Sequence, residues 1–262
     1  MEEQIKENES LPEAVETEIV PQPVHQKKRR VTTLVREMWP AYLIEILVII
    51  LGISITLALE EWRDLNKEKQ LENIYLKNLQ ADVEVDLQSL KEVISGTQKI
   101  VSTGNELLAF TRNQQAKEMS AQQVDQDVKT ILGRPKFFSS DATFSDLKSS
   151  GNLHLLKDVT LKNMLFAYYS QTQNIKEMQD AEQQATITLS GNYFLKKFPI
   201  ANSDAPGALS RTTSAKNQLL DFEFDNNVLL RVLTRKELLD DYHTADSLAG
   251  NLKIELSEKI EK

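Results

Sequence analysis

Carboxylates and a histidine crowd together near the C-terminus of the 262-residue sequence, as Asp240, Asp241, His243 and Asp246. Asp240 and His243 are three residues apart and would share one helix face, like half of the Glu-x-x-His metal motif of di-iron bundles. That chemistry needs a second, inward-facing half, and the sequence has no matching pair. We therefore predict a hydrated helix face here, with no metal and no cofactor.

Other candidate catalytic groups lack partners at the spacing that catalysis needs. His25 lies in a glutamate-rich tail, and His154 lies between two leucines. Gly-x-Ser-x-Gly, phosphate-loop and His-Glu-x-x-His motifs are absent. The chain has no cysteine, which excludes a thiol nucleophile, a disulfide framework and a thiolate-bound metal. The sequence therefore predicts a protein that is not an enzyme, and its net charge of −8 argues against nucleic acid as a partner.

A long apolar run predicts a transmembrane helix over residues 40–62. Residues 41–59 contain one charge, Glu45, and as a helix they would cover about 28 Å, close to the hydrocarbon thickness of a bilayer. Trp39 and Trp62, the only tryptophans, flank the run where interfacial aromatic anchors belong. A cleaved signal peptide is the alternative, but its basic region would be forty residues long.

Five residues of the run are candidates for contacts inside the membrane. Glu45 would either bind a polar group of another subunit or simply benefit from the helix N-terminus and nearby headgroup water. The others form two small-xxx-small pairs, Gly52 with Thr56 and Ser54 with Ala58. Such pairs let helices approach closely, so they predict contact with a second span.

The flanks of the run predict its orientation. Basic residues precede it more often than they follow it, with Lys27, Lys28, Arg29, Arg30 and Arg36 before it and Arg63, Lys67 and Lys69 after it. The positive-inside rule then places the N-terminus in the cytoplasm and residues 63–262 in the periplasm, across a bacterial inner membrane. Residues 1–30 are predicted to be a disordered tail with a basic end, and residues 31–39 a short interfacial helix.

The remainder predicts an all-α fold, an antiparallel bundle of about four main helices. Apolar residues recur every three or four positions from Leu76 to Leu108, with Gly96 and Gly104 expected to kink or end that helix. Further helices are predicted over 116–132, after a capping Asp141, and after a capping Asp158. Gly151 is predicted to take the left-handed conformation of a helix cap. The last of these helices is expected to have one face of its polar middle, residues 171–184, in water, and residues 199–224 are expected to form a loop. The inward residues of that helix are predicted to be Leu161, Leu165, Tyr168, Ile175, Met178, Ala185 and Leu189.

The last helix is predicted to open at Thr234, which stands in capping-box spacing with Glu237. Its apolar positions then alternate by four and three residues: Leu238, Tyr242, Ala245, Ala249, Leu252 and Leu256. This heptad seam, with small residues in its middle, is typical of close helix packing, either inside the bundle or against a partner.

Several residues resemble those of a known family. In and near the span they are Tyr42, Glu45-Ile46, Gly52-Ile53, Ala58-Leu59 and Trp62. Further along they are Phe144, Leu147, Ser150-Gly151, Leu153 and Tyr168-Tyr169. Over roughly residues 40–185 the chain resembles short single-span inner-membrane proteins of Bacteroidetes-type bacteria, a domain of unknown function. The resemblance implies location and architecture and brings no known activity, cofactor or catalytic residue.

Two functional hypotheses follow. The first is a non-enzymatic scaffold or accessory subunit that works through helix–helix contacts with itself or with another envelope protein, beside the lipid bilayer. The alternative is a periplasmic ligand sensor of the four-helix type that signals through a partner. A long exposed apolar seam would favour the scaffold, and a buried polar cluster in a roomy pocket would favour the sensor.

Overall fold

The computed structural model describes residues 31–112, 119–198 and 221–261, with side chains from residue 39 onward. These residues are helical apart from short connections, and none of them forms a β-strand. The chain divides into two compact units, residues 1–60 and residues 61–262. The predicted all-α class is confirmed over the described residues, whereas the tail at 1–30 lies outside them.

The first unit contains an apolar helical segment. Helix α1 is continuous over Val31–Arg112, so the expected short helix at 31–39 is part of it, and Pro40 lies inside it. Residues 39–60 are all exposed, among them a long series of leucine, isoleucine and valine side chains. This segment is long and apolar enough to cross a membrane.

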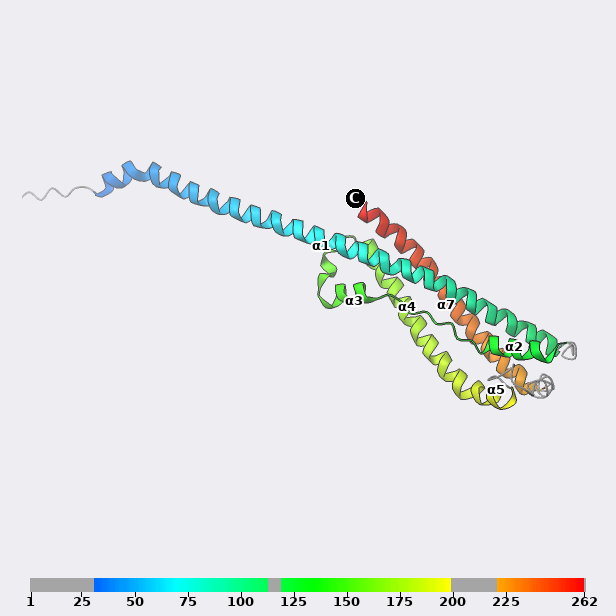
Figure 1. Ribbon diagram of the computed structural model, residues 1–262. Coiled ribbons are helices and arrows are strands. Elements are labelled where there is room, and N and C mark those ends of the chain that lie inside the picture. Colours follow the sequence, from blue (N-terminus) through cyan, green and yellow to red (C-terminus); the bar gives the residue numbers. More distant parts are fainter. Residues whose placement is uncertain (1–30, 113–118, 199–220, 262) are drawn as a thin grey trace, which may run out of the picture. The chain divides into compact units, whose positions relative to one another are not determined.

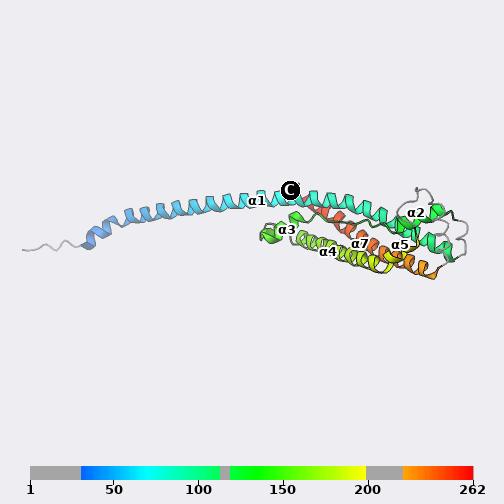
Figure 2. The same cartoon turned by 60° about the horizontal axis from the view of Figure 1, so that its bottom comes forward.

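Three long helices build the second unit: α1 from residue 61 onward, α4 (Val159–Ala185) and α7 (Phe222–Ile260). Helices α1 and α4 run in the same direction and α7 runs opposite to both (Figures 1 and 2). Between α1 and α4 the chain forms α2 (Ala121–Ile131), α3 (Ala142–Ser149) and the short 3₁₀ turn η2 (Asn152–His154). Of the four main helices expected, three are these long helices and the fourth, expected over 116–132, is the shorter α2; an extended segment then leads from α2 to α3.

That extended segment, residues 131–140, is called the strap below. It is non-helical from residue 133 onward and runs back along the unit from α2 to α3 (Figure 1). Its side chains alternate, since Phe137 is buried and Phe138 is exposed. An extended chain without a neighbouring strand leaves its backbone groups unpaired, so they need other partners.

Helix ends follow the expected capping chemistry at some positions. Asp158 caps α4, its Oδ1 accepting from the backbone N–H groups of Thr160 (2.7 Å) and Leu161 (3.1 Å). Asp141 occupies the N-cap position of α3 but makes no side-chain capping bond. Gly151 has a φ of 76°, the left-handed conformation predicted for it.

Other boundaries differ from expectation. Helix α2 begins at Ala121 after a capping Ser120 instead of at residue 116, whose structure lies outside the described residues. Helix α7 begins at Phe222, twelve residues before Thr234, because Asp221 caps it and its Oδ1 accepts from the Glu223 N–H. Thr234 is inside the helix and donates to the carbonyl of Leu230. Residues 222–224 thus belong to α7, and the rest of the expected loop, 199–220, is outside the described residues.

The second unit has two apolar cores, one at each end. The first contains Leu79, Leu90, Leu165 and Tyr168 together with the whole predicted seam of α7. The second gathers α2, the start of α7 and the aromatic side chains of α5 (Asn192–Lys197). Every seam residue from Leu238 to Leu256 is fully buried, so this seam packs inside the bundle.

A π-helical turn, η3 (Thr186–Gly191), links α4 to α5. A π turn adds a residue to the helical repeat and so rotates the face that follows. Leu189, predicted to point inward, is exposed, while Ser190 and Phe194 are buried. The three–four spacing that places Leu161, Leu165 and Ile175 correctly therefore fails beyond Ala185.

Gly96 and Gly104 do not end α1. A Cβ at Gly96 would lie 3.3 Å from Pro135 of the strap, and one at Gly104 would lie 2.4 Å from Cγ2 of Val232 on α7. The glycines therefore allow the strap and α7 to approach α1 closely. By contrast, a Cβ at Gly250 of α7 would meet nothing within 4 Å.

We predict opposite effects of alanine at these glycines. Gly104→Ala should destabilise the bundle by about 1–2 kcal/mol, because the new methyl group overpacks against Val232. Gly250→Ala should stabilise it by about 0.5–1 kcal/mol, because alanine is the better helix former and the site is open. Urea unfolding of the full chain in detergent, followed by circular dichroism, measures both. Equal effects of the two substitutions would contradict the close contact at Gly104.

Candidate functional site

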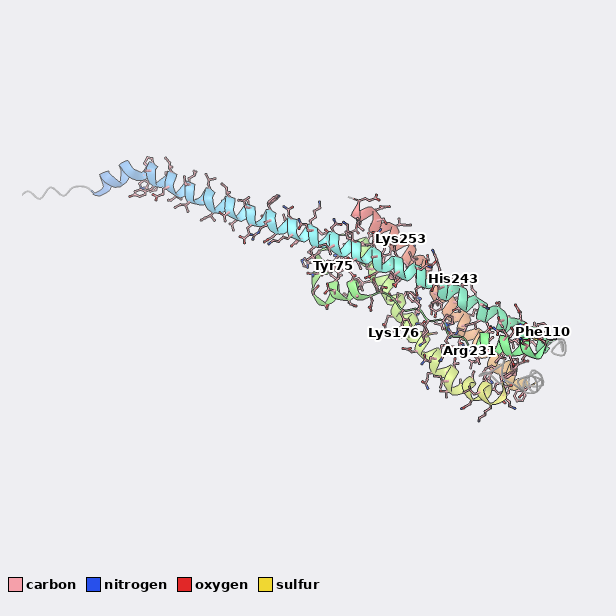
Figure 3. All side chains as sticks on the ribbon, viewed as in Figure 1. Tyr75, Phe110, Lys176, Arg231, His243 and Lys253 are labelled. Atoms are coloured by element: carbon pink, nitrogen blue, oxygen red, sulfur yellow. The ribbon has the colours of Figure 1, made fainter. Side chains whose placement is uncertain are left out.

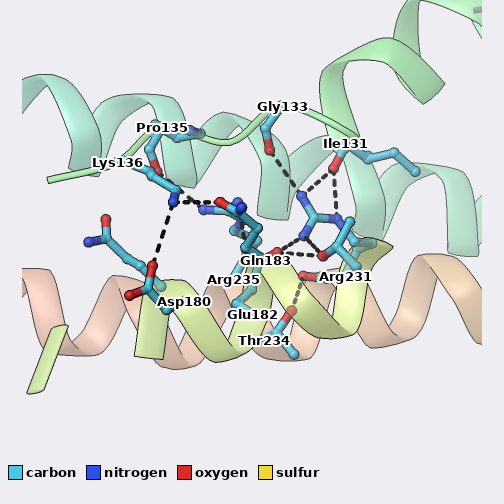
Figure 4. Close-up of polar contacts among 12 residues, drawn as sticks. Ile131, Gly133, Pro135, Lys136, Asp180, Glu182, Gln183, Arg231, Thr234 and Arg235 are labelled. Carbon is cyan, nitrogen blue, oxygen red and sulfur yellow. Dashed lines mark hydrogen bonds and ion pairs between the residues drawn. The ribbon is translucent and has the colours of Figure 1, made fainter. Parts of the chain in front are cut away.

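A buried polar layer separates the two apolar cores, and Arg231 of α7 is at its centre (Figure 4). Its guanidinium donates to three oxygen atoms, two of them carbonyl oxygens of the strap and one the hydroxyl of Thr186 in η3. Nε and Nη2 donate to the carbonyl of Ile131 (3.1 and 3.0 Å), and Nη2 also donates to that of Gly133 (2.9 Å). Nη1 donates to the Thr186 hydroxyl at 2.8 Å. The side chain is 1% exposed, so these bonds replace its water.

Glu182 of α4 supplies the carboxylate of the layer. Its side chain forms an ion pair with Arg231 and a second one with Arg235, whose Nη2 is 3.0 Å from Oε2. Arg235 also donates from Nη1 to the carbonyl of Pro135 at 3.3 Å, while its Nε is buried without a hydrogen bond. Two guanidinium groups thus share one carboxylate, and carbonyls of Ile131, Gly133 and Pro135 accept from other N–H groups of the two arginines.

The electrostatic state of this layer follows from its burial. Burial lowers the pKa of Arg231 to about 9 and that of Arg235 to about 10, values that leave both side chains charged at neutral pH. The Glu182 carboxylate between them favours these charged forms. Breaking such a buried pair leaves an uncompensated charge in a medium that solvates it poorly.

Gln179 continues the layer toward the middle of the strap. Its Oε1 accepts from the Phe137 N–H (2.7 Å) and from the Tyr242 hydroxyl (3.0 Å), and its Nε2 donates to the Phe137 carbonyl (2.9 Å). Lys136 donates to Gln183 Oε1 at 2.6 Å on the outer side. The amide of Gln179 thus gives the strap the pair of hydrogen bonds that a neighbouring strand would provide.

Asp86 of α1 holds the far end of the strap. It is fully buried, and its carboxylate accepts from the Ser140 N–H (2.7 Å), the Ser139 hydroxyl (2.8 Å) and the Tyr168 hydroxyl (2.6 Å). Burial, and then this bond to Asp86, raises the pKa of Tyr168 above its ordinary value. Tyr169 donates to the Ser140 carbonyl at 3.3 Å and stacks on Phe144, with ring centroids 4.4 Å apart.

This arrangement positions backbone and does not present a reactive group to a ligand. Surface pockets of about 150, 470 and 520 Å³ are lined by other residues. The first two lie near Lys69 and Glu72, and the third lies beside Phe110 and α2. None of these three is lined by Glu182, Arg231 or Arg235.

The acidic group at the C-terminus is spread over the surface of α7. Asp240 and His243 are exposed, and Asp241 Oδ1 accepts from Gln171 Nε2 of α4 at 3.0 Å (Figure 3). No group of three or more acidic, histidine or cysteine residues able to hold a metal ion occurs among the described side chains. His154 is exposed, with Nδ1 2.9 Å from the Gly151 carbonyl.

The candidate membrane contacts belong to the first unit and are exposed. Glu45, Ser54 and Ala58 are exposed, and so are Trp39 and, at the start of the second unit, Trp62, which flank the apolar segment. Thr56 donates to the Gly52 carbonyl at 2.9 Å, so its hydroxyl is satisfied within the helix. A Cβ at Gly52 would meet nothing within 4 Å.

The polar layer itself was missed by sequence reasoning, which expected residues 171–184 to have one face in water and did not place Gln179 or Glu182 on the inward face. The signal was nevertheless present. Arg231 and Arg235 occupy positions of the same three–four repeat as Phe224, Val228 and Leu238 on α7. Glu182 continues the repeat of Ile175 and Gln179 on α4. Opposite charges on the buried stripes of two helices predict an internal ion pair.

These features define an all-helical protein in which an apolar helical segment precedes a helical bundle with a polar middle layer. A model of a family of unknown function, DUF6090, matches residues 45–195, which are 151 of the 262 residues. The chain belongs to this family. The match includes the apolar segment, the strap, Asp86 and Glu182, and ends before Arg231 and Arg235 on α7. No curated protein and no solved structure matches the chain.

We predict that the carboxylate of Glu182 is required for stability. Glu182→Gln keeps the shape but leaves two buried guanidinium groups without a counter-charge, which should lower the free energy of unfolding by about 3–5 kcal/mol. Glu177→Gln is the matched control, since Glu177 is exposed on the same helix and should change stability by at most about 0.5 kcal/mol. Urea unfolding of the full chain tests both, and an unaffected Glu182→Gln protein would refute the role of the ion pair.

Proposed function

We propose that this protein is a single-pass protein of the bacterial inner membrane, with its N-terminus in the cytoplasm and its bundle in the periplasm. In this proposal it acts as a non-enzymatic scaffold or accessory subunit through helix–helix contacts. The exposed apolar segment of α1 supports membrane insertion, because its side chains contact no other part of the first unit. The basic residues before that segment support the orientation.

The observation that carries the scaffold role is the closed interior of the bundle. Arg231 and Gln179 bond to the strap and Glu182 pairs with Arg231, so these side chains stabilise a shape, and none of the three surface pockets named above is lined by them. The α7 seam cannot be the partner surface, because it is buried inside the bundle. Contacts with partners must therefore use exposed helix faces, including the outer face of α1 and the small-residue face around Gly52.

A periplasmic ligand sensor remains the second candidate. The π turn η3 favours it, since such turns occur often at functional sites and this one adjoins the polar layer through Thr186. A ligand that shifted α4 by displacing Thr186 could move the bundle relative to a partner. The scaffold is preferred because the polar layer is packed against the strap.

Cross-linking in native membranes tests the scaffold. We expect purification through a C-terminal tag to recover one other envelope protein with this chain in a constant ratio, unchanged by Glu177→Gln. A sensor that acts alone would instead be recovered without a second protein, and this outcome would reject the accessory-subunit role.

The orientation is tested by labelling, because the chain has no native cysteine. A membrane-impermeant maleimide added outside cells whose outer membrane is permeabilised should label Lys176→Cys, an exposed position of α4. It should not label Ser10→Cys until the inner membrane is broken. Labelling of Ser10→Cys in intact spheroplasts would reverse the proposed topology.

A further inference from the structure

The outer face of α1, opposite the bundle, carries an unpartnered heptad pattern over residues 71–85. Leu71, Ile74, Ala81 and Val85 are exposed, with Ile74 at 54% and Val85 at 61%. Their spacing is that of alternating a and d positions in a coiled coil, with Asn78 at the central a position. The opposite side of α1 packs against the rest of the bundle. Its buried residues are Leu76, Leu79, Val83, Asp86 and Leu90.

We propose that this face pairs with the same face of a second copy of the chain, as a parallel two-stranded coiled coil. The inference rests on the proposed single-span topology, because copies inserted the same way into one membrane have α1 helices that run in the same direction. In a parallel pair, each a residue meets its own counterpart, so Asn78 would face Asn78 of the other copy. A single asparagine at an a position specifies the register of such dimers.

Charge complementarity supports a second copy as the occupant. With Leu71 at position a, Lys77 is at position g and Asp82 is at position e of the next heptad. Residues at g and e contact each other across a parallel dimer, so Lys77 of each copy would meet Asp82 of the other. Asp82 is half-buried and its Oδ2 is buried without a hydrogen bond within one copy, so the contact with Lys77 would use the other carboxylate oxygen, Oδ1.

The size of the face fits a pair that depends on the membrane. Four apolar side chains over two heptads are too few for a stable free dimer, since short helices in water are marginal. Confinement of both copies to one bilayer raises their effective concentration without any further contact. The small residues Gly52 and Thr56 would allow the apolar segments to approach as well.

Disulfide cross-linking in native membranes tests the pairing. The full chain carrying Asn78→Cys is oxidised with copper phenanthroline, and products are separated by mass. We expect a covalent dimer, because a disulfide needs Cβ atoms about 3.5–4.5 Å apart and facing a positions meet closely. Co-expression of two differently tagged copies shows whether both chains in the product are this protein.

Asn73→Cys is the matched control. It is the same substitution at another exposed asparagine of α1, five residues away and about 140° around the helix. It should yield several-fold less dimer than Asn78→Cys. Ile74→Lys, placed in the Asn78→Cys chain, should also reduce the dimer several-fold, and because Ile74 is exposed the bundle should remain folded by circular dichroism.

Three results would overturn the pairing: equal dimer from Asn73→Cys, no dimer from Asn78→Cys, or a product that joins Asn78→Cys to a different protein. These outcomes are independent of the scaffold test. A covalent dimer with no other envelope protein would keep the pairing and reject the accessory role. Recovery of one other envelope protein in a constant ratio, without the covalent dimer, would keep the accessory role and reject the pairing.

Discussion

The bundle depends on one constraint, which is that an extended stretch of backbone packs along its long helices without a neighbouring strand. Unpaired buried carbonyl and N–H groups are costly, so each requires a partner from a side chain. Arg231 and Arg235 supply donors to Ile131, Gly133 and Pro135, and Gln179 supplies both a donor and an acceptor to Phe137. Charged side chains are therefore buried where they bind the inward-facing carbonyl groups of the strap.

The ion pair with Glu182 follows from the same constraint. Two guanidinium groups brought inside to bind carbonyls need a counter-charge, and α4 provides one where it faces α7. At the other end, Asp86 accepts from the Ser140 N–H and receives the Tyr168 hydroxyl. The three long helices are thus connected through the strap. Such polar interiors favour a single packing arrangement over sliding alternatives, which suits a protein proposed to present fixed surfaces.

Prediction from the sequence succeeded where one local rule decides the outcome. Capping by Asp158, the left-handed Gly151 and the buried seam from Leu238 to Leu256 all follow from short-range chemistry and helical repeat. Prediction failed where a distant segment, or an irregular turn of the helix itself, decides the surroundings of a residue. Gly104 was expected to interrupt α1, but its small size is needed by Val232 of α7, which is more than a hundred residues away. Leu189 was expected inside, but the π turn rotates it to the surface.

The sequence alone determined the all-helical class, the long apolar segment with Trp39 and Trp62 at its flanks, and the absence of a cysteine-based site. These properties depend on composition and periodicity, which act over a few turns of helix. Only the tertiary structure decided that the strap bonds to side chains of all three long helices and that Glu182, Arg231 and Arg235 are buried together. It also decided that the α7 seam is internal while the outer face of α1 is free. The reason is physical: burying a charge is favourable only when its partners are in place, and those partners come from segments far apart in the chain.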